Sequence, residues 1–295
     1  MRVGSRKLLM AVATAIVGLA LAVPAAGAAA PELGATADEV DLRSVPGTEA
    51  YGDGHAIPLE AARPDWYTRK LRRKVRAADG EPVQAPPDAP LPSEVGIRPG
   101  SWMLDPSGCT MNFVFASGGQ LGIGTAGHCA KVGQQVVLLT LAPGTENPVL
   151  VNIGRTVVSH DNGVGDDFAL VEIRPELNEW VFPTTALVAG PCGQYFGAGP
   201  ETVAHSGHGL AIGTGGTPRV GVALTWQNDA FGWDGAAIFG DSGSPVRVTD
   251  LKAAGDLTHL VVDPNFLPSF IAGTRIGKIE QINGGWTLVN SSLCP

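Results

Sequence analysis

Hydrophobic residues in the last two thirds of the chain occur in short runs bounded by glycine, proline, asparagine and aspartate. Examples are the runs at 111–115, 135–139, 168–173 and 220–226. Short apolar runs between turn residues are typical of β-strands. No long 3.6-residue period interrupts them before the C-terminal stretch, where we expect one short helix. The pattern predicts an all-β sandwich or barrel rather than alternating strands and helices.

The N-terminal residues follow a different pattern. Three basic residues precede an apolar run over 8–23, and small residues then end in Ala-Gly-Ala at 26–28. This order predicts a secretory signal peptide over residues 1–28. The apolar run is shorter than the usual membrane-spanning length of about 20 residues, which argues against a membrane anchor. We therefore expect a secreted, extracellular protein without membrane contact once the signal peptide is removed.

Residues 29–98 differ from the strand-rich part that follows. Tyr67, Leu71 and Val75 recur at a spacing of four residues among basic side chains, which predicts a short basic amphipathic helix. The proline-rich stretch at 85–100 predicts an extended linker. We interpret residues 29–98 as a pro-segment and linker.

Charge is unevenly divided along the chain. Residues 1–98 carry equal numbers of acidic and basic residues, so the whole net charge of −8 falls on residues 99–295. A basic helix beside an acidic domain suggests a pro-segment that docks on that domain, as in a zymogen. A basic helical face that is simply solvated would give the same sequence, and this alternative stays open. An acidic domain argues against nucleic acid as a partner.

The cysteines point to disulfides rather than to a metal. In a secreted protein, four cysteines without a C-x-x-C spacing favour two disulfides, and three pairings are possible. His205 and His208 form an H-x-x-H pair, but the sequence offers no third ligand or adjacent glutamate, so we expect no metal site. The cysteines are Cys109, Cys129, Cys192 and Cys294.

Three short motifs combine residues that carry chemistry: TAGHC at 125–129, DDFAL at 166–170 and GDSGSP at 240–245. A serine hydroxyl becomes a nucleophile when a base takes its proton, and small neighbouring residues leave backbone N–H groups free to bind an oxyanion. A carboxylate that enters an apolar strand can hold an imidazole in one tautomer. Each motif alone also fits an ordinary turn or a buried side chain. Together, in the order histidine, aspartate, serine, they favour a catalytic triad.

These motifs resemble the active-site motifs of the chymotrypsin-like serine proteases, in particular the secreted bacterial branch that includes the streptogrisins. The resemblance implies that His128 is the general base, that Asp167 orients it and that Ser242 is the nucleophile. It also implies an oxyanion hole made of the backbone N–H groups of Gly240 and Ser242. Asp166 is the less suitable acid, because the aspartate of the family directly precedes the hydrophobic strand.

The resemblance covers residues 99–295 and implies a fold as well as a site. The family has two antiparallel six-stranded β-barrels, with the active site at their junction. An α/β-hydrolase uses the same groups in the order serine, acid, histidine. His259 is the only histidine after Ser242 in this sequence. The stretch between them is too short to contain the strand and loop that carry the acid in an α/β-hydrolase, which excludes that fold.

The resemblance further implies a disulfide between Cys109 and Cys129, which leaves Cys192 to pair with Cys294. No cofactor is expected for this chemistry. We expect a monomer whose partners are a protein or peptide substrate and its own pro-segment.

Two departures from the family pattern concern the surroundings of the serine. Ser244 stands where the family has a second glycine. The N-terminus that pairs with the aspartate before the nucleophile in animal members is absent. Bacterial members use an arginine instead, and at the matching position this chain has His205. We therefore predict that His205 approaches Asp241, although Arg219 and Arg247 could serve in its place.

Substrate preference is encoded less directly. Trypsin-like members of the family carry an aspartate at the base of the substrate pocket, six positions before the serine, and this chain has Ala236 there. The resemblance therefore implies an apolar pocket that includes Ala236, Ala237 and Phe239 and disfavours basic substrates. Asp234 stays a possible pocket residue. We predict a secreted serine endopeptidase that acts through an acyl-enzyme intermediate. Two alternatives stay open: a secreted binding protein that keeps the fold without turnover, and an esterase on the same fold.

Overall fold

The computed structural model describes residues 40–41, 55–145, 147–185, 189–209, 217–262 and 268–294. They all belong to one compact unit, Ala37–Pro295. The predicted signal peptide lies outside the described residues. Among the described residues, no helix is long and apolar enough to cross a membrane.

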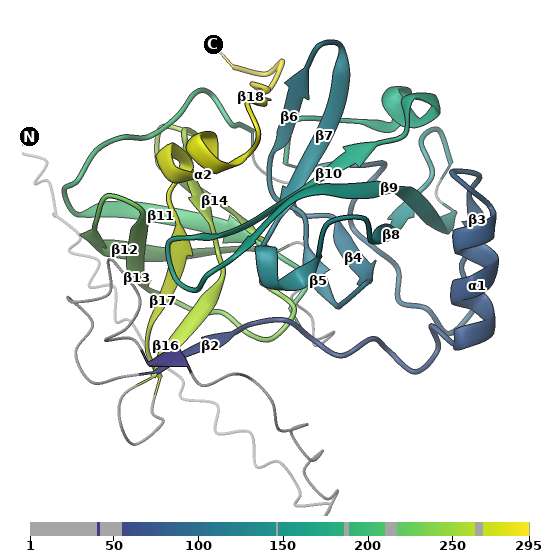
Figure 1. The fold of residues 1–295 in the computed structure, drawn as a ribbon, viewed down its shortest axis with the longest axis horizontal. Coiled ribbons are helices and arrows are strands. Elements are labelled where there is room, and N and C mark those ends of the chain that lie inside the picture. The colour runs from purple at the N-terminus through teal and green to yellow at the C-terminus, as the bar shows by residue number, and fades with distance from the viewer. Residues whose placement is uncertain are drawn as a thin grey trace, which may run out of the picture. The chain divides into compact units, whose positions relative to one another are not determined.

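Two antiparallel sheets make up most of the structure, as the strand-and-turn pattern predicts (Figure 1). The first sheet has the strand order β18-β6-β7-β10-β9-β8-β4-β5, and β3 adds to it by pairing with β9. Its strands are β3 (Val83–Gln84), β4 (Trp102–Asp105), β5 (Cys109–Thr110), β6 (Val114–Ser117), β7 (Gln120–Thr125), β8 (Gln135–Leu141), β9 (Pro148–Asp161), β10 (Asp167–Ile173) and β18 (Thr287–Leu288).

The second sheet has the order β1-β2-β16-β17-β13-β12-β11-β14-β15. It combines strands from the C-terminal half of the chain with two strands that precede residue 60. Its strands are β1 (Val40–Asp41), β2 (His55–Pro58), β11 (Glu201–Ser206), β12 (Pro218–Trp226), β13 (Ala230–Asp234), β14 (Pro245–Val248), β15 (Ala253–Asp256), β16 (His259–Val262) and β17 (Pro268–Thr274).

The expected all-β class and the short C-terminal helix are confirmed, the latter as α2 (Ile276–Ile282). The expected strand count differs. Among the described residues each sheet has nine strands instead of six, and short strands account for two of the three extra strands in each sheet. β3 and β18 join the first sheet, and β1 and β2 extend the second sheet from β16.

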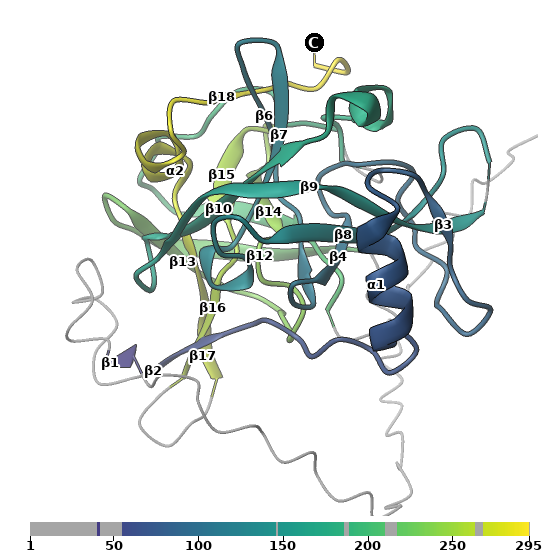
Figure 2. The same cartoon turned by 45° about the vertical axis from the view of Figure 1, so that its right-hand side comes forward.

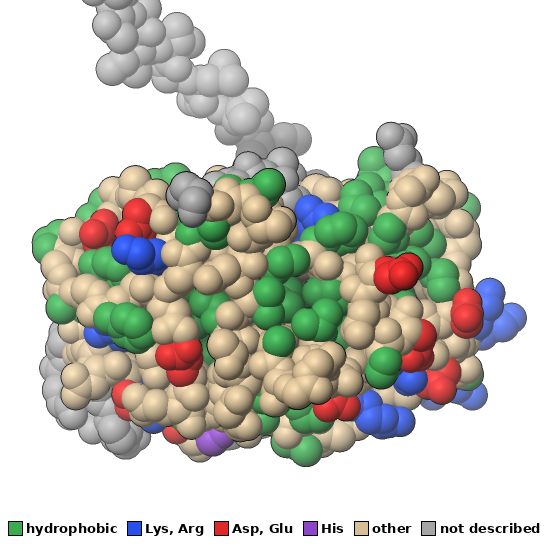
Figure 3. All heavy atoms as spheres, turned by 90° about the horizontal axis from the view of Figure 1, so that it is seen from above, with side chains coloured by type: hydrophobic (Ala, Val, Ile, Leu, Met, Phe, Trp, Pro, Cys, Tyr) green, Lys and Arg blue, Asp and Glu red, His purple; other side chains and the backbone are tan. Residues whose placement is uncertain are grey.

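The predicted basic helix is confirmed as α1 (Arg69–Ala77). It lies along one side of the first sheet, near β8 and β9 (Figures 1 and 2). Val75 is fully buried in an apolar cluster with residues of β4, β8 and β9. Arg76 Nε lies 2.6 Å from a carboxylate oxygen of Asp105, which is itself buried. On one face of the molecule, basic side chains are most evident at the edge on the α1 side (Figure 3).

Both disulfides form the predicted pairs. Cys109–Cys129 joins β5 to the turn after β7, and Cys192–Cys294 ties the C-terminal residues to the segment that precedes β11. The Cα atoms lie 6.4 Å and 5.5 Å apart, within the usual range for a disulfide. The first bridge therefore fixes the turn that contains the histidine of TAGHC.

Candidate active site

The three sequence motifs lie at strand ends that the two sheets bring together. Thr125 ends β7, and the short 3-10 helix Gly127–Cys129 follows and carries His128. Asp167 is the first residue of β10, which pairs with both β7 and β9. Ser242 lies in the turn between β13 and β14. The histidine and aspartate therefore come from the first sheet and the serine from the second.

The glycine of TAGHC allows a close approach between two segments. A Cβ atom on Gly127 would lie 1.6 Å from the carbonyl oxygen of His160 on β9, a distance that no side chain tolerates. The absence of a side chain lets the histidine turn pack against β9 and so reach β10. Substitution of this glycine would push His128 away from Asp167.

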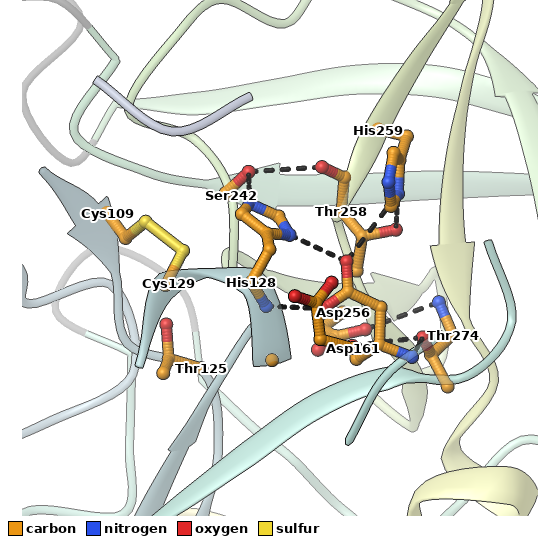
Figure 4. A network of polar contacts seen from close by, with 12 residues as sticks. Cys109, Thr125, His128, Cys129, Asp161, Ser242, Asp256, Thr258, His259 and Thr274 are labelled. Carbon is orange, nitrogen blue, oxygen red and sulfur yellow. Dashed lines mark hydrogen bonds and ion pairs between the residues drawn. A yellow bond between two sulfur atoms is a disulfide. The ribbon is translucent and has the colours of Figure 1, made fainter. Parts of the chain in front are cut away.

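His128 lies between the other two side chains. Its Nδ1 is 2.6 Å from Oδ2 of Asp167, and its Nε2 is 2.8 Å from Oγ of Ser242. The backbone N–H of His128 also donates to Oδ1 of Asp167 at 2.9 Å. The carboxylate thus holds both the ring and the backbone of the histidine. Figure 4 shows the ring pointing toward Ser242, with the Cys109–Cys129 disulfide nearby.

Asp166 belongs to a different group of side chains. Its carboxylate accepts a hydrogen bond from the amide of Asn162 at 2.9 Å, and the other oxygen lies 3.6 Å from Nδ1 of His160. Of the two adjacent aspartates, Asp167 is the one that contacts His128. This agrees with the preference stated from the sequence.

The buried pair of His128 and Asp167 has linked protonation. Burial alone would lower the pKa of His128, but the charge of Asp167 and its hydrogen bond outweigh burial and raise that pKa above its ordinary value. For Asp167, burial would raise the pKa, and the charge and hydrogen bonds of His128 lower it below its ordinary value instead. The site therefore favours a carboxylate that supports a positive imidazolium.

The hydroxyl of Ser242 has two possible acceptors. Oγ lies 2.8 Å from Nε2 of His128 and 3.0 Å from the carbonyl oxygen of Thr258 (Figure 4). A hydroxyl has one proton to donate, so it can serve only one acceptor at a time. When the hydroxyl donates to a neutral His128, Nε2 of the ring is in position to accept the proton as a general base.

Behind the carboxylate lie further titratable groups. Nδ1 of His259 is 3.6 Å from Oδ2 of Asp167, and burial lowers the pKa of this histidine to about 4, so the ring is neutral at neutral pH. Burial and the charge of Asp167 raise the pKa of Asp256 well above its ordinary value. Among these neighbours, neither His259 nor Asp256 is charged at neutral pH. The carboxylate of Asp167 therefore interacts with the charge of His128 alone within this group.

The backbone N–H groups of Gly240 and Ser242 converge on one oxygen. Both donate to the carbonyl oxygen of Leu59, over 2.5 Å and 3.4 Å. Gly240 and Gly243 have φ values of +101° and +86°, a left-handed conformation that glycine adopts without strain. These two glycines give the turn the shape in which its N–H groups point the same way.

Arg219 is the partner of Asp241, and the predicted contact with His205 is wrong. Two terminal nitrogens of Arg219 each lie 2.5 Å from a carboxylate oxygen of Asp241. The His205 ring instead lies 2.9 Å from the carbonyl oxygen of Ala236. Burial lowers the pKa of His205 to about 4, so the ring carries no charge to offer at neutral pH. The guanidinium keeps its charge and matches a carboxylate with two bonds.

Ser244, the departure from the family motif, fits the space that is left for it. It is fully buried, and its N–H donates to the carbonyl oxygen of Asp241 at 2.8 Å. A Cβ on Gly207 would lie 2.0 Å from the Ser244 hydroxyl. Gly207, the residue after β11, therefore makes room for the larger residue, and the turn around Ser242 keeps its hydrogen bonds.

The residues expected in the substrate pocket are partly brought together. Ala237 and Phe239 pack against the apolar cluster of the second sheet, whereas Ala236 and Asp234 are exposed.

The two ring nitrogens of His208 face other groups than His205. They lie 2.8 Å from the carbonyl oxygen of Gly100 and 2.9 Å from a carboxylate oxygen of Glu94.

Two residues at the site were missed from the sequence. Leu59 precedes every motif and lies in a stretch with no chemical signature. Thr258 takes part through its backbone carbonyl, which any residue could supply. The apolar run at 260–262, soon after the serine motif, was the available signal for a strand at this place.

Comparison with known proteins gives fold-level likenesses. No protein-family model matches the chain, and no curated protein matches it. Thermobifida fusca protease A is 20% identical, with 67% of this chain and 98% of that chain covered and a TM-score of 0.46. Nocardiopsis protease is also 20% identical, with 65% and 98% covered and a TM-score of 0.45. A glutamic acid specific serine protease is 14% identical, with 65% and 100% covered and a TM-score of 0.46. These values do not establish a family, so the function must be argued from the site.

Proposed function

We propose that this protein is a secreted serine endopeptidase that hydrolyses peptide bonds through an acyl-enzyme intermediate. The observation that carries the proposal is the unbroken chain of contacts from Asp167 through His128 to Ser242, at 2.6 Å and 2.8 Å. A base must lie within about 2.6–3.2 Å of the proton that it abstracts, and both contacts meet this condition. The disulfides are consistent with an oxidising, extracellular environment.

In the proposed mechanism, Ser242 attacks the carbonyl carbon of the substrate while His128 Nε2 takes the hydroxyl proton. Asp167 stabilises the imidazolium that forms, which is consistent with the raised pKa of His128. The negative charge that develops on the substrate oxygen is bound by the N–H groups of Gly240 and Ser242. His128 then donates the proton to the leaving amine, and water releases the acyl group by the same steps in reverse.

The remaining groups hold this arrangement in place. Arg219 and Asp241 form a buried ion pair beside the oxyanion donors. The Cys109–Cys129 disulfide supports the turn of His128. Ala237 and Phe239 contribute to an apolar substrate pocket, and the two curled sheets correspond to the two barrels of the protease family, with the site at their junction.

Hydrolysis of casein by purified variants tests the proposal. Asp167→Asn would leave the imidazole in the wrong tautomer, and such a change lowers kcat by about 10⁴-fold. Asp166→Asn is the matched control, because that carboxylate does not contact the ring. The proposal predicts that Asp166→Asn retains activity within about twofold, because the substitution keeps the shape of the side chain and its partners, Asn162 and His160, lie outside the triad. Equal activity of the two variants would contradict it.

A further inference from the structure

A segment of the chain itself lies in the candidate active site as an extended strand. β2 pairs antiparallel with β16, and the partners are Pro58 with His259, Ile57 with Leu260 and Ala56 with Val261. Figures 1 and 2 show β2 beside β16 at the edge of the second sheet. The pairing continues one residue further, because Leu59 N–H donates to the carbonyl oxygen of Thr258 at 3.2 Å. An extended peptide added to a sheet edge is a common form of peptide recognition.

The carbonyl group of Leu59 is the point where this strand meets the catalytic groups. Its oxygen accepts hydrogen bonds from the N–H groups of Gly240 and Ser242, the two donors that would stabilise an oxyanion. Thr258, whose carbonyl oxygen holds the Leu59 N–H, also lies 3.0 Å from the Ser242 hydroxyl. Leu59 is thus held through its carbonyl oxygen by Gly240 and Ser242 and through its N–H by Thr258, beside the nucleophile.

The chain is held on the other side of this carbonyl as well. Glu60 is exposed, but Ala61 pairs with Gly108 through two backbone hydrogen bonds of 2.7 Å and 3.0 Å. The backbone is therefore fixed before and after the bond between Leu59 and Glu60. A bond held on both sides beside a nucleophile and an oxyanion site is placed for cleavage.

The side chain of Leu59 fills an apolar pocket. It is 1% exposed and belongs to the apolar cluster of the second sheet, against which Ala237 and Phe239 also pack. Its neighbours in this cluster are aliphatic and aromatic side chains, among them Phe231 and Ile271. Burial of an unpaired charge is costly, so the pocket favours an aliphatic side chain at this position.

We propose that the Leu59–Glu60 bond is the first substrate of this protein, cleaved within the same molecule, and that the site prefers leucine-like residues before the cleaved bond. This inference rests on the proposed function. Ser242 Oγ bonds to the Leu59 carbonyl carbon and its proton passes to His128. The C–N bond to Glu60 breaks, and the Glu60 nitrogen takes that proton. Water then hydrolyses the Leu59 ester, which leaves a free carboxylate at Leu59 and restores Ser242.

The packing determines which part of the chain would leave. Downstream of the bond, Val75 of α1 is buried, Arg76 pairs with Asp105, and β3 pairs with β9. These contacts keep residues 60–98 on the first sheet after cleavage. The released segment therefore ends at Leu59, well before the boundary at residue 98 that the sequence suggested. Until it leaves, β2 occupies the strand position that any other substrate would need.

The N-terminus of the purified protein tests the cleavage. Wild-type protein should begin at Glu60 by N-terminal sequencing and intact mass, whereas Ser242→Ala should retain the residues before it. A wild-type N-terminus at any other position would overturn the inference, as would a Ser242→Ala chain that also begins at Glu60. Reaction of wild-type Ser242 with a fluorophosphonate, measured in the same samples, separates this failure from failure of the proposed function.

Substitutions at Leu59 test the preference. Leu59→Asp should lower the cleaved fraction at this bond at least tenfold, because a charge is costly in an apolar pocket, while Leu59→Met should leave it nearly unchanged. Leu91→Asp is the matched control, since Leu91 is exposed and lies outside the strand. With mature enzyme, the peptide HAIPLEA should be cut between its leucine and glutamate, and an aspartate in place of leucine should protect it. Equal cleavage of both peptides would refute the preference.

Discussion

Removal of Arg219 should destabilise the protein and impair its proposed catalysis together. Asp241 is fully buried, and Arg219 provides two bonds of 2.5 Å to its carboxylate. In Arg219→Met the carboxylate stays buried and keeps the N–H of Ile238, at 2.8 Å, as a neutral donor. Loss of one partner of a buried ion pair costs about 3–5 kcal/mol, because the other charge is left uncompensated.

The lower end of that range applies here, because the Arg219 side chain is 15% exposed and solvent screens part of the interaction. We expect a loss of about 3 kcal/mol, which lowers Tm by roughly 6–12 °C for a domain of this size. Asp241 lies between the two oxyanion donors in sequence. If their geometry changes, kcat should fall by about 10²-fold, the usual effect of losing one such donor.

Urea unfolding and casein hydrolysis measure the two effects. Arg155→Met is the control, since this exposed arginine makes one bond of 3.1 Å to the Gly133 carbonyl. Its free energy of unfolding should stay within about 0.5 kcal/mol of wild type. The double variant Arg219→Met/Asp241→Asn should recover part of the lost stability, because it removes the buried charge. Unchanged stability in Arg219→Met would refute the reasoning.

Three further predictions concern protonation and cross-linking. Asp167 raises the pKa of His128 above 6.5, so kcat/KM should fall as the pH is lowered through a midpoint above that value. A pH–rate profile with its acidic midpoint below 6.5 would contradict this. Asp256 has a pKa well above 3.8, so the folded state keeps a proton that the unfolded state releases, and stability should decline as pH rises from about 4 toward the folded pKa. Urea titrations of Asp256→Asn should lack this decline; an identical pH dependence would count against a protonated Asp256. Cys109→Ala/Cys129→Ala should lose roughly 3 kcal/mol in urea unfolding, given the 20-residue separation, and a loss below about 1 kcal/mol would show that the bridge does not constrain the turn.

Local chemistry made much of the site predictable from the sequence. The histidine, aspartate and serine motifs each combine a reactive side chain with small or apolar neighbours, and the structure brings His128, Asp167 and Ser242 within hydrogen-bond distance. The disulfide pairs and the basic helix also agree with the sequence. The motifs and the helix depend on residue types at short spacing, which a sequence displays directly, whereas the disulfide pairs followed from the family resemblance.

The partner of Asp241 was not predictable in this way. His205 and Arg219 are directly opposite each other on β11 and β12, so both lie on the same part of the sheet. Burial decides between them, because it lowers the pKa of His205 to about 4 and leaves only the arginine charged. The burial of a side chain depends on how the strands pack, and spacing along the chain does not reveal it.

The strand in the active site was missed for a similar reason. Residues 55–61 have no motif, and their partners lie far along the chain, in β16 and at Gly108. The helix pattern and the proline-rich stretch that follow it placed it within the predicted pro-segment and linker, residues 29–98. Long-range pairing of the same kind adds β1 and β2 to the second sheet and β3 and β18 to the first sheet.

The most direct test of the central claim is the site of covalent modification by a fluorophosphonate. Such a reagent reacts with a serine whose proton is removed by an adjacent base and whose phosphoryl oxygen is bound by nearby N–H groups. Peptide mapping by mass spectrometry should find the adduct on Ser242 in wild-type protein, and the His128→Ala variant should react slower by several orders of magnitude. An unmodified Ser242, or equal modification in the two proteins, would contradict a serine nucleophile activated by His128.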